Sequence, residues 1–339
     1  MSFSTNVSFS TEISSLTLES YFSQSDFQGG LPLNFTLSQE SLTLDDCNAE
    51  NSSKLELVVF SDLLLANLLN LQNDCDLNIE TLHAINDRNN LTSYRFLVSC
   101  VDFEKSRKAL ADFALANKIE AALIQNAPKL EMPGLLVMDM DSTTIEIECI
   151  DEIAKLAGVG EQVSAVTELA MQGELDFAQS LYQRVATLKD SPEQILADVA
   201  KNIPLMAGLE TLITELKKYN WRIAVASGGF TYFADHLKEM LALDDTFANV
   251  LEIVDGKLTG KVLGGVVDAQ VKADSLNLLA EKYQIPSTQT VAMGDGANDL
   301  VMMAAASFGV AFHAKPIVLA QADSSINQQG LDCLLHWLA

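Results

Sequence analysis

Apolar and polar residues follow one order of elements before residue 130 and another after it. Between 54 and 125 they predict a strand, a helix, two strands, a helix and a last strand, at 54–60, 63–74, 78–85, 93–101, 103–118 and 120–125. The first 50 residues are rich in Ser, Thr, Asn and Asp and show only a weak pattern, so no structure is predicted for them. A proline-containing stretch at 126–134 is typical of a linker. We therefore predict one domain over 51–128 and a second over 132–339.

The first of these domains has the element order of the ferredoxin-like motif, and is predicted to be α+β. The second has the pattern of a parallel α/β sheet. Three short apolar runs, at 134–141, 221–229 and 288–296, end on small or acidic residues, and helical patterns separate them. Ligands of such sheets bind beyond the carboxyl ends of the strands. The ends of all three runs should therefore lie at one edge of a Rossmann-like sheet.

An insertion between the first two apolar runs is too long for a single crossover helix. Four segments within about 149–203 have a helical period and begin near Asp, Gly or Ser. We expect them to form a helical cap over the active edge of the sheet. Farther along, the stretch 251–265 contains an Asp-Gly pair typical of a hairpin turn.

Composition and charge argue against several classes of function. The 339 residues include 46 acidic and 21 basic side chains, and the formal net charge of −25 argues against nucleic acid or an anionic membrane surface as a partner. No run approaches the roughly 18 apolar residues of a membrane span, and the start lacks the features of a signal peptide. The five scattered cysteines form no CxxC pair, so neither a disulfide framework nor a zinc site is predicted, and a cytoplasmic location is expected.

Four pieces of sequence at the predicted sheet edge can carry chemistry. They are DMDST at 139–143, SGG at 227–229, GDGAND at 294–299 and Lys272 in the helical segment that starts at 271. A carboxylate cluster without histidine or cysteine suits a hard cation with oxygen ligands, such as Mg²⁺. Small residues let backbone N–H groups approach a phosphate, and lysine adds a positive charge. Together they predict a phosphoryl-transfer site in which Asp139 can act as the nucleophile.

Each piece taken alone also has a structural explanation. DMDST could be a solvated turn after a strand, SGG a simple turn, GDGAND a fragment of a calcium loop, and Lys272 a surface lysine. Their order and their common sheet edge favour the catalytic interpretation. The four histidines match no motif, and Cys149 has no base partner, so neither residue type is assigned to catalysis.

Residues 132–339 resemble the haloacid dehalogenase superfamily, and within it the phosphatases that act on O-phospho-L-serine in the last step of serine biosynthesis. The motifs quoted above occur in the family's order and spacing. The resemblance implies Mg²⁺-dependent hydrolysis of a phosphoric monoester through an aspartyl-phosphate, with Asp139 as nucleophile and Asp141 as general acid and base. It implies a metal held by the carboxylates of Asp139 and Asp295 and by the main-chain carbonyl of Asp141, with Asp299 beside these ligands.

The resemblance also implies which residues contact the substrate. Ser227, Gly228 and Lys272 would hold the phosphoryl group, and Asn298 would complete that part of the site.

Four cap residues match the family's substrate contacts. Glu148 would bind the amino group of the substrate, Arg184 its carboxylate, and Met171 and Phe177 would close over the site. A guanidinium group suits bidentate binding of a carboxylate, which agrees with the role implied for Arg184. From the residues alone, Arg184 could equally form an ion pair on the helix surface, and Met171 and Phe177 could be cap core.

Other functions are compatible with parts of this pattern. A related small-molecule phosphatase, or a phosphotransferase that passes the phosphoryl group to an alcohol, would carry the same motifs. A receiver-like signalling module also phosphorylates an aspartate at a strand end, but it needs no large cap. The 51–128 domain resembles ACT-type amino-acid-binding domains, which implies serine binding or pairing of chains in a homo-oligomer, with a passive folding module as the alternative.

Overall fold

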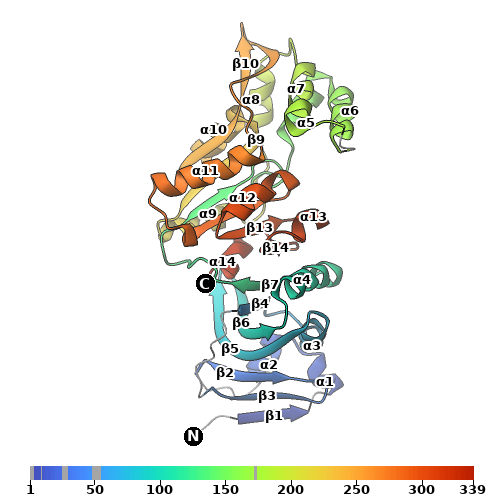
Figure 1. Cartoon of the computed structure of the whole chain (residues 1–339), viewed down its shortest axis with the longest axis vertical. Coiled ribbons are helices and arrows are strands. Elements are labelled where there is room, and N and C mark those ends of the chain that lie inside the picture. Colours follow the sequence, from blue (N-terminus) through green and yellow to red (C-terminus); the bar gives the residue numbers. More distant parts are fainter. Residues whose placement is uncertain (1–3, 9, 25–29, 48–54, 172–173) are drawn as a thin grey trace. The chain divides into compact units, whose positions relative to one another are not determined.

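Contacts within the computed structural model divide the chain into two units. The structure describes residues 4–8, 10–24, 30–47, 55–171 and 174–339. Unit 1 comprises Met1–Ala127 and Leu319–Ala339, and unit 2 comprises Pro128–Val318. Both units contain helices and strands (Figure 1), and the predicted α/β class is confirmed. Among the described residues, no helix combines the length and apolar character needed to cross a membrane.

Unit 1 is built on an antiparallel sheet with the strand order β1-β3-β2-β5-β6-β4-β7. The six elements predicted between 54 and 125 are present in the predicted order: β4 (Leu55–Phe60), α3 (Leu65–Asp74), β5 (Leu77–Arg88), β6 (Leu91–Cys100), α4 (Phe103–Asn117) and β7 (Ala121–Gln125). Because β4 lies between β6 and β7, the split β-α-β arrangement expected from the sequence is formed.

The N-terminal residues, for which no structure was predicted, extend this sheet. They form β1 (Ser4–Ser8), α1 (Thr11–Ser14), α2 (Leu18–Gln24), β2 (Leu33–Leu37) and β3 (Ser41–Asp46). Strand β2 buries Leu33, Phe35 and Leu37 and exposes the residues between them. This alternation is the signature of a half-buried strand, but the run is only five residues long and lies among turn-forming residues.

The C-terminal residues belong to unit 1, whereas the sequence placed them in the domain 132–339. They form β14 (Ser324–Ile326), η3 (Leu331–Cys333) and α14 (Leu334–Trp337). Arg95 of β6 donates hydrogen bonds to the carbonyl oxygens of His336 (2.8 Å) and Leu338 (3.0 Å). The Trp337 side chain is fully buried, with its ring centroid 5.7 Å from that of Phe60. Arg95 thus pairs with carbonyl groups that the end of a helix leaves without partners, and these hydrogen bonds help to hold α14.

Unit 2 contains the predicted parallel sheet. Strands β10 (Asp245–Val254), β9 (Arg222–Phe230), β8 (Leu135–Met138), β12 (Thr290–Gly294) and β13 (Phe308–Phe312) lie side by side in this order, each parallel to its neighbour. Strand β11 (Lys257–Leu263) pairs antiparallel with β10 and forms the predicted hairpin. The accompanying helices are α9 (Leu209–Lys218), α10 (Thr231–Leu241), α11 (Ala269–Lys282), α12 (Leu300–Ala305) and α13 (Pro316–Leu319).

Four helices occupy the predicted cap insertion and lie together beside the β10–β11 hairpin (Figure 1). They are α5 (Cys149–Ala157), α6 (Gly160–Met171), α7 (Phe177–Thr187) and α8 (Gln194–Ala200). Helix α7 begins with a reciprocal cap: Asp176 accepts a hydrogen bond from the Gln179 amide (2.8 Å), and the Gln179 side chain accepts one from the Asp176 amide (3.1 Å). This cap fixes the start of the helix that carries Phe177 and Arg184.

Candidate active site

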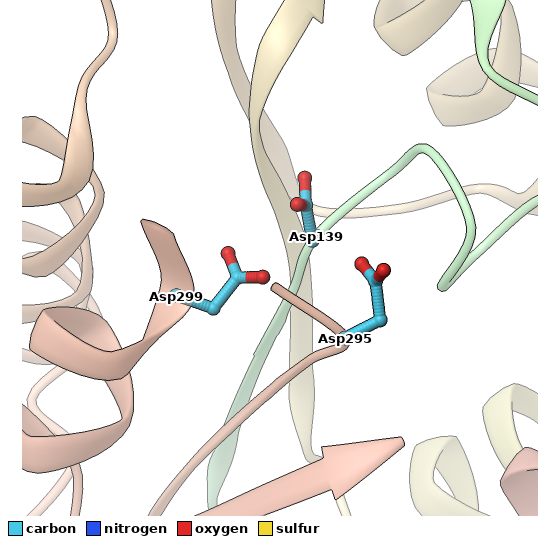
Figure 2. Close-up of side chains that lie close together, drawn as sticks. All are labelled: Asp139, Asp295 and Asp299. Atoms are coloured by element: carbon cyan, nitrogen blue, oxygen red, sulfur yellow. The ribbon is translucent and has the colours of Figure 1, made fainter. Parts of the chain in front are cut away.

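Adjacent strands of the unit 2 sheet bring the predicted catalytic residues to one edge. Strand β8 ends one residue before Asp139, β12 ends one residue before Asp295, and Ser227 lies near the end of β9. Since these strands are neighbours in the order β9-β8-β12, their carboxyl ends meet. Figure 2 shows Asp139, Asp295 and Asp299 close together, and one oxygen from each carboxylate lies within 4.8 Å of the others. The structure thus brings together residues that are far apart in the chain.

The carboxylate of Asp139 is held by one hydrogen bond on each oxygen. The Met140 amide donates to Oδ1 (2.7 Å), and the Lys272 ammonium lies 2.7 Å from Oδ2. The Thr144 hydroxyl also donates to the main-chain carbonyl of Asp139 (2.5 Å). Asp139 is only 6% exposed, so its side chain has a defined orientation at the floor of the site.

Lys272 is a fully buried cation between two carboxylates. Its Nζ lies 2.7 Å from Asp139 Oδ2 and 2.7 Å from Asp299 Oδ1. Burial alone would lower the pKa of the ammonium group, but Asp139 and Asp299 outweigh burial and raise it well above its usual range. Asp299 also accepts a hydrogen bond from the Gly296 amide (3.1 Å). The surface-lysine alternative for Lys272 is therefore wrong.

The surroundings of two of the clustered carboxylates disfavour their charged form. Burial, and then the nearby Asp139, raise the pKa of Asp295, and the same two causes raise the pKa of Asp299 against the opposing effect of Lys272. The donor set consists of oxygen atoms only. Such a set fits Mg²⁺, whose charge would offset the repulsion among the carboxylates.

Asp141 lies two residues beyond Asp139 and is perturbed more strongly. Loss of hydration, followed by the negative charges of Glu148 and Asp139, raises the pKa of Asp141 to about 8. The Cys149 amide donates to its Oδ1 at 3.3 Å, which opposes the shift only weakly. At neutral pH, Asp141 therefore holds a proton that it can donate.

Replacing Asp141 with Asn should stabilise the metal-free protein near neutral pH. Because the native pKa of about 8 exceeds the usual value near 4, the folded state binds more protons than the unfolded state between these values, and the free energy of unfolding falls as pH rises. Asparagine does not titrate. With EDTA present, we expect the variant to gain on the order of 2 kcal/mol over the wild type at pH 7.5. Thermal unfolding at pH 4 and 7.5 measures this, and a stability difference independent of pH would contradict the assignment.

A cavity of about 330 Å³ opens above these groups and is lined by both the sheet edge and the cap. Nine predicted site residues line it: Asp139, Asp141, Glu148, Phe177, Arg184, Ser227, Gly228, Asp295 and Asn298. Lys272 and Asp299 are not in this lining; the buried Lys272 contacts both Asp139 and Asp299 from below the surface. The cap helices therefore contribute to the same cavity as the clustered carboxylates.

Arg184 of α7 lines this cavity and has no ion pair with any residue that the structure describes. Its Nε atom is buried and has no hydrogen-bond partner, and no ion pair to Arg184 is present among the described residues. Three acidic residues, Asp151, Glu148 and Asp141, lie near enough to affect its charge. The surface ion pair considered from the sequence is not formed, so this guanidinium is available to an anionic ligand.

Phe177 and Glu148 border the cavity in different ways. A Cβ atom placed on Gly228 would lie 2.5 Å from Cζ of Phe177, so the ring packs directly on this glycine and would have to move for any larger residue. The Ser142 hydroxyl donates to Oε1 of Glu148 at 2.8 Å and orients the Glu148 carboxylate. Ser142 has a φ of 56°, a left-handed conformation uncommon for residues other than glycine. For Met171, the last residue of α6, the side chain lies outside the described part of the chain.

Sequence reasoning missed several residues of the site. Ile150, Leu181, Phe230 and the α13 region, with Lys315, Ile317 and Val318, also line the cavity. Leu181 lies one helical turn from both Phe177 and Arg184 on α7, so the helical period could have identified it. Ile150 follows Glu148 by two residues, a spacing that the helical period does not bring to one face. Lys315 lies after β13, at the same sheet edge as the motif residues, and the sheet-edge argument could have identified it too.

Comparisons with known proteins agree with this geometry. Residues 134–307 match the family model of the haloacid dehalogenase-like hydrolases. The chain is 61% identical over 216 residues to a phosphoserine phosphatase of Vibrio cholerae, a match covering 64% of this chain and 66% of that enzyme, just under two thirds of its length. It is 60% identical over 222 residues to the phosphoserine phosphatase of Haemophilus influenzae, covering 66% of this chain and 71% of that enzyme.

A solved structure gives the same result. The structure described as a phospho-aspartyl intermediate analogue of phosphoserine phosphatase is 43% identical and superposes with a TM-score of 0.58, covering 61% of this chain and 100% of that one. The family model matches more than half of the chain, including the cap and the sheet edge, and each relative matches about two thirds of the chain. The chain therefore belongs to the haloacid dehalogenase-like hydrolases and, within them, to the phosphoserine phosphatase family.

Proposed function

We propose that the protein hydrolyses O-phospho-L-serine to L-serine and phosphate, as the last step of serine biosynthesis in the cytoplasm. The observation that carries this proposal is the shared cavity, which is lined both by Asp139 and by a cap arginine that has no ion pair among the described residues. A phosphomonoester with a carboxylate at its far end matches these two features. The two relatives described above are named phosphoserine phosphatases, which supports phosphoserine as the substrate.

The first half of the reaction is transfer of the phosphoryl group to Asp139. A carboxylate oxygen of Asp139 attacks phosphorus while the bond from phosphorus to the serine oxygen breaks. Asp141, protonated at neutral pH, donates its proton to the departing serine oxygen. The two hydrogen bonds on Asp139, from Met140 and Lys272, limit rotation of the carboxylate before attack.

The second half of the reaction is hydrolysis of the aspartyl-phosphate. Asp141, now a carboxylate, takes a proton from water as the water oxygen attacks phosphorus, and the bond from phosphorus to Asp139 breaks. Phosphate leaves, Asp139 is regenerated, and Asp141 is protonated again. One residue thus acts first as acid and then as base.

The clustered carboxylates fit a magnesium ion. Asp139 and Asp295 would hold it together with the main-chain carbonyl of Asp141, and Asp299 would steady Lys272 beside them. Bound there, Mg²⁺ would neutralise the phosphoryl oxygens as charge moves during transfer. Ser227, Gly228 and Asn298 would donate hydrogen bonds to the same oxygens from the cavity wall.

The cap would recognise the rest of the substrate. Arg184 would bind the serine carboxylate and Glu148, held by Ser142, the ammonium group. Phe177 would exclude water above Gly228, and the role of Met171 in closing over the site stays a prediction. For unit 1, serine binding and pairing of chains through an ACT-like domain are further parts of the proposal.

Phosphate release from a panel of phosphomonoesters, with Mg²⁺ and with EDTA, tests the proposed function. We expect L-phosphoserine to be the best substrate of the panel and EDTA to remove nearly all activity. Another phosphomonoester hydrolysed more efficiently would assign the chain to a different substrate, and transfer to added alcohols in preference to water would make it a phosphotransferase. A phosphorylated protein that persists in Mg²⁺ would indicate a receiver-like module.

A further inference from the structure

Asn249 of β10 is a buried amide that joins two parts of the active site. Its side chain is only 1% exposed. Its Nδ2 donates to the carbonyl oxygen of Gly228 at 2.8 Å, and its Oδ1 accepts from the Val267 amide at 2.8 Å. Both partners are backbone groups outside β10, so one side chain links the last residues of β9 to the segment before α11.

The hydrogen bond to Gly228 restrains the backbone at a residue with few steric limits of its own. The absence of a side chain at Gly228 makes room for the Phe177 ring, which a Cβ atom there would displace. A glycine has the widest choice of backbone torsion angles, so the peptide that follows it is poorly fixed by local sterics. The amide of Asn249 holds this peptide by its oxygen, and the neighbouring Gly229 amide is held in turn by the Ser227 hydroxyl at 2.9 Å.

The contact with Val267 positions the helix that carries Lys272. Val267 precedes Asp268, whose side chain accepts a hydrogen bond from the Val271 amide (3.0 Å) and caps the start of α11. Lys272 follows within the first turns of this helix and reaches Asp139. A displacement of the segment at Val267 would therefore move the base of the Lys272 side chain.

We propose that Asn249 is a positioning residue for the phosphoryl group, which sets the distance between the Gly228 backbone and Lys272. This inference rests on the proposed phosphatase function of the cavity, though not on phosphoserine being the substrate. Asn249 does not line the cavity, and it belongs to none of the sequence motifs. Its role would be to fix the relative position of two phosphate-binding elements, because its side chain forms one hydrogen bond with the backbone on each side.

Asn249→Leu removes both hydrogen bonds and keeps the number of heavy atoms in the side chain. We expect inorganic phosphate to inhibit this variant about tenfold more weakly than the wild type, because two backbone groups that orient the site lose their buried partner. The Michaelis constants for phosphoserine and for an aryl phosphate should rise by a similar factor, since both substrates share the phosphoryl group. Phosphate inhibition within about twofold of the wild type in the folded variant would overturn the proposal.

Gln289→Met is the matched control. Gln289 is also a buried amide, 4% exposed, and it bridges the amide (2.7 Å) and carbonyl (3.0 Å) of Lys129, but it precedes the start of β12, at the end of the sheet away from the site. A comparable loss of thermal stability with unchanged phosphate inhibition is expected. If Gln289→Met weakened phosphate binding as much as Asn249→Leu, the effect would be a general loss of stability and the proposal would fail.

A second variant and a second readout do not depend on turnover. Asn249→Ala leaves room for a water to replace the amide, so it should fold where the leucine variant does not. In metal-free protein, its amide hydrogens at 228–230 and 266–268 should exchange with solvent faster than in the wild type, while those of β12 keep their rate; unchanged exchange at both segments would contradict the role. If aryl phosphate but not phosphoserine is hydrolysed, the proposed substrate fails and the inference about Asn249 is still decided by phosphate inhibition.

Discussion

Replacing Asp139 with Asn is expected to lower kcat/KM for phosphoserine by about 10⁴- to 10⁶-fold. An amide oxygen does not attack phosphorus, so the covalent half-reaction has no nucleophile. The substitution also removes one of the two carboxylates that hold Lys272 and one of the three that can bind a cation. Steady-state phosphate release measures the effect. Because the side chain keeps its size, the variant should fold as the wild type does.

Asp244→Asn makes the same chemical change at the other end of the sheet. Asp244 lies just before β10, where it pairs with Arg222 (2.7 Å) and accepts a hydrogen bond from the Ile223 amide (2.9 Å). This control should keep essentially full activity. Substantial activity of Asp139→Asn, or an equal loss in Asp244→Asn, would contradict the assignment of Asp139 as nucleophile.

Arg184→Ala is the second large effect, and it is selective for the substrate. Losing one side of a desolvated charge pair with the serine carboxylate should cost about 2–5 kcal/mol in kcat/KM for phosphoserine, roughly 30- to 5000-fold. An aryl phosphate has no carboxylate, and its phosphate still meets Ser227 and the Asp139 region, so its hydrolysis should change little. The buried Nε of Arg184 has no partner in the described protein, so its removal leaves no acidic side chain without an ion pair.

Arg184→Lys separates charge from geometry. Lysine keeps the positive charge but lacks the planar fork of donors, so it should recover only part of the activity on phosphoserine. Kinetics of the wild type and both variants on the two substrates provide the comparison. Equal losses on phosphoserine and aryl phosphate would show that Arg184 supports the cap itself and does not recognise the substrate.

The residues that perform the chemistry could be predicted because strand ends gather them. Asp139 and Asp295 follow apolar runs that can only be buried strands, and the carboxyl ends of parallel strands share an edge. The ion pairs of Lys272 were outside this argument. They depend on where α11 begins. Asp268 caps that start locally, but the hydrogen bond between Asn249 and Val267 joins distant parts of the chain, and no local pattern encodes it.

The parts that were missed depend on distant contacts. Strands β2 and β3 are short and polar between their buried leucines, and they become strands by pairing with each other and with β5. The C-terminal helix α14 has apolar residues that could pack in any domain, and the hydrogen bonds that Arg88 and Arg95 donate to its last carbonyl groups show where its end is held. The sequence pattern thus predicts a helix or strand more readily than it predicts which distant element that helix or strand packs against.

Acid quenching during turnover tests the central claim most directly. The account predicts that protein mixed with phosphoserine and Mg²⁺, quenched within one turnover and digested, carries one added phosphoryl group on the peptide that contains Asp139. The same peptide from Asp139→Asn should remain unmodified. Phosphate released at the full rate with no phosphorylated peptide, or with the phosphoryl group on another residue, would contradict the proposed mechanism.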